Sequence, residues 1–364
     1  MSWSIRLGRV LGIDIKVHLT FFLLLAYIVA INYLQSRDWN IAIRELLFVT
    51  IVFAIIVMHE YGHALMARRF GVRTQDITLL PIGGVARLER IPENPQQELA
   101  IAIAGPAVNV ALAVLCWLIM AARGEELSLQ VIINPFAGIS LAQRLLAINI
   151  WLVVFNMIPA FPMDGGRVLR SLLAMVVDRV RATRTAATVG QMVALAFGFI
   201  GLFGNPMLIF IALFVWIGAA QEASDVETRS ILSGIPVRLA MIAEFHAVGP
   251  LDTLADVARL VLAGFQQDFP VVDGGKVVGI LTRRDLMEGL AASGHEAPVH
   301  KAMHTEFATA MPGEMLTEVF PRLQAARSHS LPVLEDGRLV GLLTTENVSE
   351  LLMIRTAIQQ AAQS

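Results

Sequence analysis

The sequence predicts a polytopic α-helical membrane protein of about six spans, with a small membrane-associated β hairpin, followed by a soluble α/β module. Two observations support this division. Of the 364 residues, 56% are hydrophobic and 16% are charged, whereas about a quarter of a typical soluble chain is charged. The charge is also divided unevenly: residues 1–220 carry 17 Lys/Arg against 12 Asp/Glu, and residues 221–364 carry 11 against 18. We therefore expect a membrane domain at 1–220, a linker at 221–235 and an acidic soluble part beyond it.

Six apolar runs account for the membrane domain. The first follows a basic flank, but it is longer than the apolar part of a signal peptide and no small-x-small cleavage site follows it, so we expect it to remain as a span. Each run is long enough to be considered as a membrane helix, although the last is short. The expected spans are 18–34, 45–70, 99–122, 141–162, 186–203 and 206–220.

The loops predict the orientation of these spans. Three basic residues precede the first span, five follow the second and five follow the fourth, and the alternate loops hold fewer. By the positive-inside rule, both termini and the soluble module are expected in the cytoplasm, in a multi-pass protein of the cell (inner) membrane. The basic residues form no continuous tract, which argues against nucleic acid as a partner.

A chemical motif ends the second span. His59 and His63 are four residues apart, so on a helix they lie on one face and can bind one metal ion, while Glu60 beside them can reach a water molecule held by that metal. Ionisable groups within a span are costly, and function is their default explanation. His59 lies about 14 residues into the expected helix, which places it roughly 20 Å from the outer boundary of a core about 30 Å thick.

Two further features lie between this motif and the next. Mixed apolar and polar residues around the Pro/Gly turn at 81–84 predict a β hairpin within 72–90. An open strand edge beside the metal would pair with an extended substrate; the alternative is an ordinary cytoplasmic loop. In the third span, Gly105 permits close helix packing and Asn109 can hydrogen-bond across helices.

A second polar group of residues ends the fourth span. Between Asn156 and Gly166, two prolines and two glycines interrupt the helix around Asp164. Such an interruption is tolerated where the freed backbone is buried in protein or lines a watery cavity. Two histidines and one aspartate give three protein ligands and leave a fourth position for water, which is the pattern of a catalytic zinc site. The alternative makes Asp164 a helix cap.

These motifs resemble those of the site-2 protease family of intramembrane zinc metalloproteases (peptidase M50). The resemblance rests on His59-Glu60-x-x-His63, on Asn156-x-x-Pro-x-x-Pro-x-Asp164-Gly and on Gly-Pro-x-x-Asn109 between them, and it covers about residues 1–220. It implies that His59, His63 and Asp164 bind one Zn²⁺, that Glu60 is the catalytic acid/base, and that Asn156 lies near the scissile peptide. No PDZ-like insertion, found in one branch of the family, is visible.

The soluble part contains an internal repeat with an offset of 62 residues. Residues 269–285 align with 331–347, with seven identities, and each copy is expected to form strand, helix, strand, turn, strand and helix. The pair resembles tandem CBS domains, expected at 236–295 and 296–357, with a tail at 358–364. The resemblance implies that Thr282 with Asp285, and Thr344 with Asn347, contact an adenine nucleotide such as ATP, ADP or AMP. Ligand-free homodimerisation is the alternative.

Together these features predict an intramembrane zinc endopeptidase that hydrolyses peptide bonds within or near the transmembrane segment of membrane-protein substrates. The CBS pair would regulate it. Because paired CBS domains also accompany channels and transporters, an ion path built from the intramembrane His and Asp residues is the alternative. Glu60 distinguishes the two functions, since hydrolysis requires it and an ion path does not.

Overall fold

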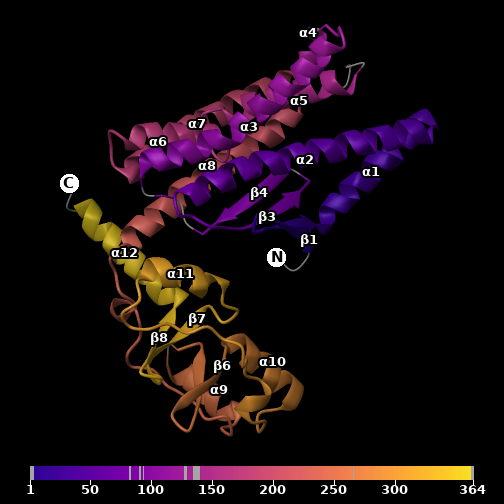
Figure 1. Cartoon of the computed structure of the whole chain (residues 1–364). Coiled ribbons are helices and arrows are strands. Elements are labelled where there is room, and N and C mark those ends of the chain that lie inside the picture. Colours follow the sequence, from indigo (N-terminus) through magenta and orange to yellow (C-terminus); the bar gives the residue numbers. More distant parts are fainter. Residues whose placement is uncertain are drawn as a thin grey trace. The chain divides into compact units, whose positions relative to one another are not determined.

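The computed structural model separates into two compact units, Met1–Val226 and Glu227–Ser364 (Figure 1). It describes residues 4–81, 83–89, 92, 94–126, 129–133, 140–264 and 266–361. Ile82 and Arg90 of the expected hairpin region, and residues 362–364 of the expected tail, lie outside this range.

Long apolar helices make up most of the first unit. Five of them have the length and hydropathy to cross a membrane: α1 (Leu19–Ser36), α2 (Trp39–Arg69), α3 (Pro95–Ala122), α7 (Arg179–Phe203) and α8 (Met207–Leu232). A sixth apolar helix, α5 (Leu141–Asn156), has 16 residues. These six helices correspond one to one with the six expected spans, which confirms the predicted fold class. The short helices α4 (Leu129–Ile133) and α6 (Asp164–Ala174) were not expected.

Several helix boundaries differ from the expected ones; α7, for example, begins at Arg179, seven residues before the expected start of the fifth span. α2 begins at Trp39, where the Asp38 side chain accepts a hydrogen bond from the Asn40 backbone amide and caps the helix. α5 ends at Asn156, six residues before the expected end of the fourth span. The backbone preceding a proline avoids the helical region, so Pro159 accounts for this early stop. α8 continues to Leu232 and makes most of the expected linker helical.

A four-stranded sheet lies beside the helices, in the order β1 (Ser4–Val10), β2 (Ile13–His18), β3 (Thr74–Leu80), β4 (Gly83–Leu88). The β3–β4 hairpin was predicted, and the β1–β2 hairpin was not. β2 pairs in parallel with β3, which joins the two hairpins. β4 is left as an edge strand, and it contacts α2 along the part of that helix that carries His59 and Glu60.

One buried carboxylate connects three of these strands. Asp76 on β3 is 3% exposed and binds Lys16 of β2 at 2.6 Å, and it also pairs with Arg87 of β4. The hydrogen bond from Arg87, together with the charges of Arg87 and Lys16, outweighs burial and lowers the pKa of Asp76 to about 2. Asp76 is therefore ionised at neutral pH and ties β2 and β4 to β3.

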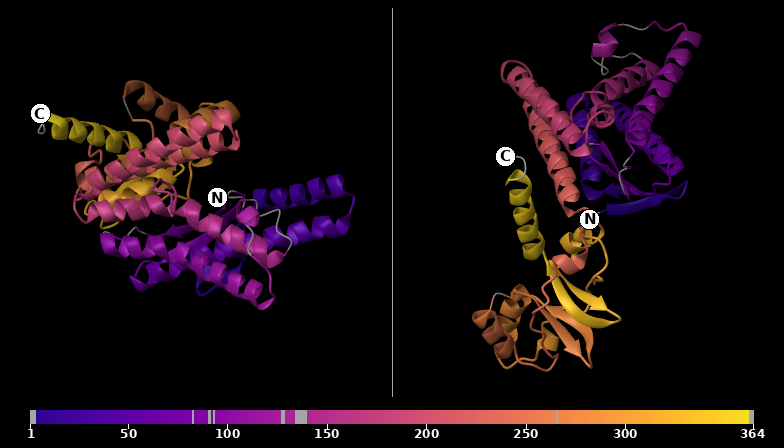
Figure 2. Two further views of the ribbon diagram at one scale, coloured as in Figure 1. Left: turned by 90° about the horizontal axis from the view of Figure 1, so that it is seen from above. Right: turned by 90° about the vertical axis from the view of Figure 1, so that its left-hand side faces the viewer.

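α3 is the central helix of this unit and packs against α2, α5 and α6. Small residues allow the close contacts: a Cβ at Gly62 of α2 would lie 2.6 Å from the Ala104 carbonyl oxygen of α3. α7 and α8 lie side by side (Figure 2), and a Cβ at Gly201 would lie 3.0 Å from the Ile209 nitrogen. α2 and α6 both pack against α3, so residues of these three helices come close to one point.

The second unit contains the repeat. Its first copy holds α9 (Leu254–Ala263), β5 (Phe269–Asp273), β6 (Lys276–Leu281) and α10 (Arg283–Ser293), and its second holds α11 (Leu316–Ala325), β7 (Ser330–Glu335), β8 (Arg338–Thr344) and α12 (Thr345–Ala361). The first expected strand of each copy is reduced to one parallel bridge, Val248 to Val271 and Ala310 to Val333. Short 3₁₀ helices, η2 (Val237–Leu239) and η3 (Val299–Lys301), precede the copies.

The cores of the two copies exchange chain segments. The residues that enter the first copy pack into the core of the second: Leu232, Ile235, Val237 and Ala240 are buried with Leu316, Val319 and Leu343. Ala297 and Val299, which enter the second copy, are buried with Leu254, Val271 and Leu286 of the first. Each core therefore needs residues from outside its own repeat, as expected for repeats that do not bury their faces alone.

Candidate metal centre

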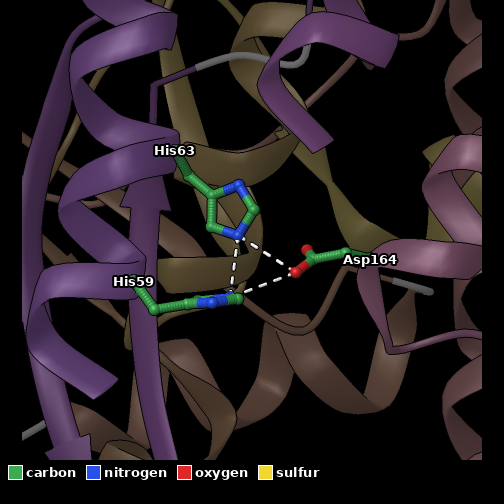
Figure 3. A group of neighbouring side chains, drawn as sticks. All are labelled: His59, His63 and Asp164. Carbon is green, nitrogen blue, oxygen red and sulfur yellow. Dashed lines mark hydrogen bonds and ion pairs between the residues drawn. The ribbon is translucent and has the colours of Figure 1, made fainter. Parts of the chain in front are cut away.

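Three side chains from two helices converge on one point in the first unit (Figure 3). His59 and His63 lie one turn apart on α2, and Asp164 is the first residue of α6. The two imidazole Nε2 atoms are 3.1 Å apart, and each is 3.1 Å from Oδ2 of Asp164. All three residues are buried, between 4% and 7% exposed.

Hydrogen bonds behind the imidazoles determine which nitrogen faces the centre. Nδ1 of His63 donates to the Ile101 carbonyl of α3 at 2.7 Å. Nδ1 of His59 donates to Oδ1 of Asn109 at 2.5 Å. Asn109 is held in that orientation because its own amide donates to Asn149, whose amide in turn donates to the Leu145 carbonyl. In the neutral tautomers that this chain of bonds selects, both Nε2 atoms carry lone pairs that point toward Asp164.

The donor set and its spacing fit zinc. Three buried acceptor atoms facing one another are costly unless a cation lies between them. Tetrahedral ligands at zinc bond lengths of about 2.0–2.1 Å are about 3.3 Å apart, close to the observed 3.1 Å. Within the described part of the chain, this is the only group of three His, Cys, Asp or Glu residues with metal-binding spacing.

Glycines make room for this centre. A Cβ at Gly105 of α3 would lie 2.2 Å from Nε2 of His63 and 2.7 Å from that of His59. A Cβ at Gly165 would lie 2.2 Å from the Ile158 carbonyl oxygen, and one at Gly166 would lie 2.6 Å from the Phe161 nitrogen. The Gly-Gly pair therefore lets the start of α6 pack onto the preceding turn, which directs Asp164 toward the imidazoles.

A cavity of about 380 Å³ opens beside the three residues. Glu60 and Asn156 both line it, so all five residues expected at this site from sequence are brought together. Glu60 packs against β4, because a Cβ at Gly84 would lie 2.9 Å from Cγ of Glu60. Nδ2 of Asn156 donates to the Leu152 carbonyl of its own helix at 2.9 Å. The other wall of the cavity is β4 itself, with residues 83–86 and Leu88.

The second unit has its own cleft, of about 650 Å³, and the four residues singled out there line it together. Thr282 caps α10: its hydroxyl accepts from the Asp285 amide at 3.1 Å and donates to the Asp285 carboxylate at 2.6 Å. Thr344 donates to Asn347 in the same manner at 2.6 Å. Asp285 differs from Asn347 in binding His304 as well, at 2.8 Å.

Several functional neighbours were not identified from sequence. Asn149 orients Asn109, but an asparagine inside an apolar helix carries no signal of its partner. Arg170 of α6 is fully buried between Glu98 of α3 and Glu222 of α8, and Glu98 also binds Arg179 of α7 at 3.3 Å. This ion-pair group ties α6 to α3 and α8, and it ties α7 to α3. Arg167, which lines the cavity, was counted only as a basic loop residue.

The fold and the site together define a membrane metallopeptidase. Residues 47–201 match the family model described as peptidase family M50, and residues 235–292 and 299–354 match the CBS domain. The zinc metalloprotease MJ0392 of Methanocaldococcus jannaschii is 32% identical over 357 residues, 97% of each chain. The chain belongs to peptidase family M50, the site-2 protease family, and is a zinc-dependent metalloprotease with a tandem CBS pair and membrane-spanning helices.

Two further proteins are similar to this chain. The putative zinc metalloprotease Rip3 of Mycobacterium tuberculosis is 33% identical over 320 residues, 82% of this chain and 78% of that one. The solved site-2 protease from Methanocaldococcus jannaschii is 36% identical, covers 61% of this chain and 95% of its own, and superimposes with a TM-score of 0.45. The alternative of an ion transporter finds no support in these matches.

Proposed function

We propose that this protein hydrolyses peptide bonds within or near the transmembrane segment of membrane-protein substrates. His59, His63 and Asp164 would hold one zinc ion, and Glu60 would act as the acid/base. The observation that carries the proposal is the convergence of three buried acceptor atoms at 3.1 Å beside a cavity lined by Glu60. His59, Glu60 and His63 lie on α2, which has the length and hydropathy of a membrane span, and Asp164 begins α6, which follows the shorter apolar helix α5.

The chemistry divides between the metal and the chain. When bound, zinc supplies a Lewis acid that lowers the pKa of a water ligand and polarises a carbonyl group. The Glu60 carboxylate accepts the proton of the attacking water and returns it to the leaving amine. The hydrogen bonds of Asn109 and Ile101 keep both imidazoles in one tautomer through the reaction.

β4 is the proposed binding edge for the substrate. A helical segment protects its carbonyl groups by internal hydrogen bonds, so it must unwind before attack. An unwound segment exposes amides and carbonyls that pair with an open strand edge. β4 has such an edge and forms one wall of the metal cavity. The structure therefore supports β-strand addition as the way in which the scissile bond is presented.

A designed reporter tests the proposal. We suggest a soluble carrier protein fused to one membrane helix of leucine and alanine, interrupted by Asn-Gly, as substrate for the purified full chain. Cleavage that stops with chelator and returns with Zn²⁺ is the expected result, with product ends within the helix or at its cytoplasmic end. Cleavage only in the soluble carrier, mapped by mass spectrometry, would contradict the proposal.

The proposal extends to regulation and placement. We place both termini and the CBS pair in the cytoplasm, from the basic residues of the loops. An adenine nucleotide in the cleft lined by Thr282 and Thr344, or dimerisation through the CBS pair, would alter the protease activity. A nucleotide changes activity only by its different affinities for two arrangements of the protein.

A further inference from the structure

One cationic side chain of the metal cavity remains without an assigned role. Arg167 lies on α6, one turn after Asp164, and is the only Lys or Arg among the described residues that line the cavity. It shares this cavity with the Glu60 carboxylate. The side chain is half-buried. Arg167 therefore shares one small space with the proposed zinc ligands and acid/base.

Arg167 differs from its neighbour on the same helix. Arg170, one turn further along, is fully buried; its Nε donates to Glu98 at 2.8 Å, and its guanidinium also pairs with Glu222. Among the described residues, by contrast, the Arg167 guanidinium has no hydrogen-bond acceptor, although the backbone carbonyl of Arg167 accepts from the Ser171 hydroxyl at 2.6 Å. One arginine is fully engaged in holding helices together, and the other lines the cavity with a side chain that carries five N–H donors.

An unpaired cation beside a membrane-embedded site is costly, which makes function the default explanation. A structural role would need a partner within the protein, as Arg170 has. The cavity already contains the acid/base that moves protons, and an arginine keeps its proton at all accessible pH values. The reaction also needs a hydrogen-bond donor that stabilises the negative charge developing on the substrate's carbonyl oxygen.

We propose that the Arg167 guanidinium donates hydrogen bonds to the carbonyl oxygen of the scissile peptide and stabilises its charge in the transition state. This inference rests on the proposed hydrolysis. Water oxygen attacks the carbonyl carbon, the π electron pair moves to the carbonyl oxygen beside Arg167, and Glu60 takes the water proton. The C–N bond then breaks, the oxygen's electron pair re-forms the carbonyl, and the amine leaves with the proton from Glu60.

Asn156 is the other polar candidate for this task. One amide hydrogen of Asn156 is already donated to the Leu152 carbonyl at 2.9 Å, which holds its side chain along α5. It has one N–H left and no charge, whereas Arg167 carries a full charge and a planar pair of donors that suits an oxyanion. The geometry therefore favours Arg167 for the charged state and leaves Asn156 to contact the substrate backbone.

The test compares Arg167→Gln and Arg167→Lys with Arg181→Gln, which replaces an α7 arginine whose side chain is 80% exposed. Arg167→Gln is expected to lower kcat for the leucine/alanine reporter by roughly 100- to 1000-fold, with KM and zinc content unchanged. Arg167→Lys keeps the charge and should lose about tenfold. Arg181→Gln should match the wild type.

Inhibitor binding supplies a measurement that does not need turnover. N-phosphoryl-Leu-Trp carries an anionic tetrahedral group, whereas a neutral peptide hydroxamate relies on the metal. Arg167→Gln should weaken the phosphoryl compound by the same factor as kcat, because both report charge stabilisation, and should leave hydroxamate affinity unchanged. This measurement tests the role of Arg167 even if the wild type does not cleave the reporter. Failure of the wild type to cleave the reporter would reject the proposed intramembrane function, not the role of Arg167.

Four outcomes would overturn the assignment of Arg167. The first is a kcat and a phosphoryl affinity near wild type in Arg167→Gln, and the second is a change confined to KM. The third is loss of zinc, and the fourth is an unchanged phosphoryl affinity with a displaced acidic limb of the pH–rate profile. The second would make Arg167 a binding residue and the third a structural one. The fourth would mean that it acts through Glu60.

Discussion

The metal cavity and the CBS cleft are both lined by the residues that sequence motifs single out, but they use their polar atoms differently. At the metal centre, two imidazole nitrogens and a carboxylate oxygen face one another at 3.1 Å, and with both imidazoles in the neutral tautomers selected by Asn109 and Ile101 none of the three atoms donates. In the cleft, Thr282 and Asp285 satisfy each other, and His304 satisfies the second carboxylate oxygen. The first arrangement needs a cation, and the second is complete without a ligand.

This difference separates two kinds of evidence for function. Acceptor atoms that converge without a donor are unstable alone, so their arrangement itself indicates what is missing. A threonine that caps a helix has a sufficient structural reason to be there, whether or not a nucleotide binds. The zinc site can thus be argued from geometry, while the nucleotide site needs an experiment that separates capping from binding.

The largest expected effect comes from removing the acid/base. Glu60→Gln should lower cleavage of the reporter by roughly a thousandfold or more, because it removes the proton acceptor. Zinc content, measured by plasma mass spectrometry, should stay near wild type because no ligand is changed. His59→Ala and Asp164→Ala serve as comparison variants and should lose the metal as well. Full turnover by the Gln variant would refute the mechanism.

The sequence predicted which side chains lie together at the metal cavity better than it predicted the sheet. The spacing of His59, Glu60 and His63 depends on helix periodicity alone, and the proline- and glycine-rich stretch before Asp164 marks a helix end, so both are local signals. β1 and β2 mix the basic residues Arg6, Arg9 and Lys16 with apolar ones, and this segment was interpreted as the basic flank of the first span. Their place beside β3 depends on a parallel pairing between residues about 60 apart, and no local pattern encodes that contact.

The second-largest effect tests the bonds behind the imidazoles. Asn109→Ala should weaken zinc binding or activity by roughly 10- to 100-fold, because His59 loses the acceptor that fixes its tautomer. Asn109→Asp keeps an acceptor and should retain more. Zinc affinity by competition with a chelating dye is the measurement. If Asn109→Ala binds zinc as the wild type does, the tautomer chain is not needed for the metal.

The nucleotide proposal predicts a smaller, asymmetric effect. Asp285→Ala should weaken ATP, ADP or AMP binding more than Asn347→Ala, because an aspartate accepts ribose hydroxyls more strongly than a neutral amide does. Calorimetric titration of the full chain measures binding, and reporter cleavage with the same nucleotides measures coupling. A coupling of about 1–3 kcal/mol would change activity roughly 5- to 150-fold. Binding without a change in cleavage would reject the regulatory link, and no binding at millimolar concentration would favour dimerisation.

The smallest effect separates capping from binding directly. Thr253 and Asp256 form the same capping box at the start of α9 that Thr282 and Asp285 form at the start of α10, with hydroxyl–carboxylate distances of 2.7 and 2.6 Å. Thr282 lines the cleft, and Thr253 is not among the residues that line it. Thr253→Ala and Thr282→Ala should each lower the free energy of unfolding by about 1 kcal/mol.

Nucleotide affinity should then distinguish this matched pair. If Thr282 contacts a phosphate, Thr282→Ala should weaken nucleotide binding by about fivefold to tenfold, the worth of one lost hydrogen bond, while Thr253→Ala should leave it unchanged. Scanning calorimetry of the full chain, with and without nucleotide, gives both quantities for each variant. Equal losses of affinity in the two variants would mean that binding follows stability, and that Thr282 acts in the CBS pair as a helix cap alone.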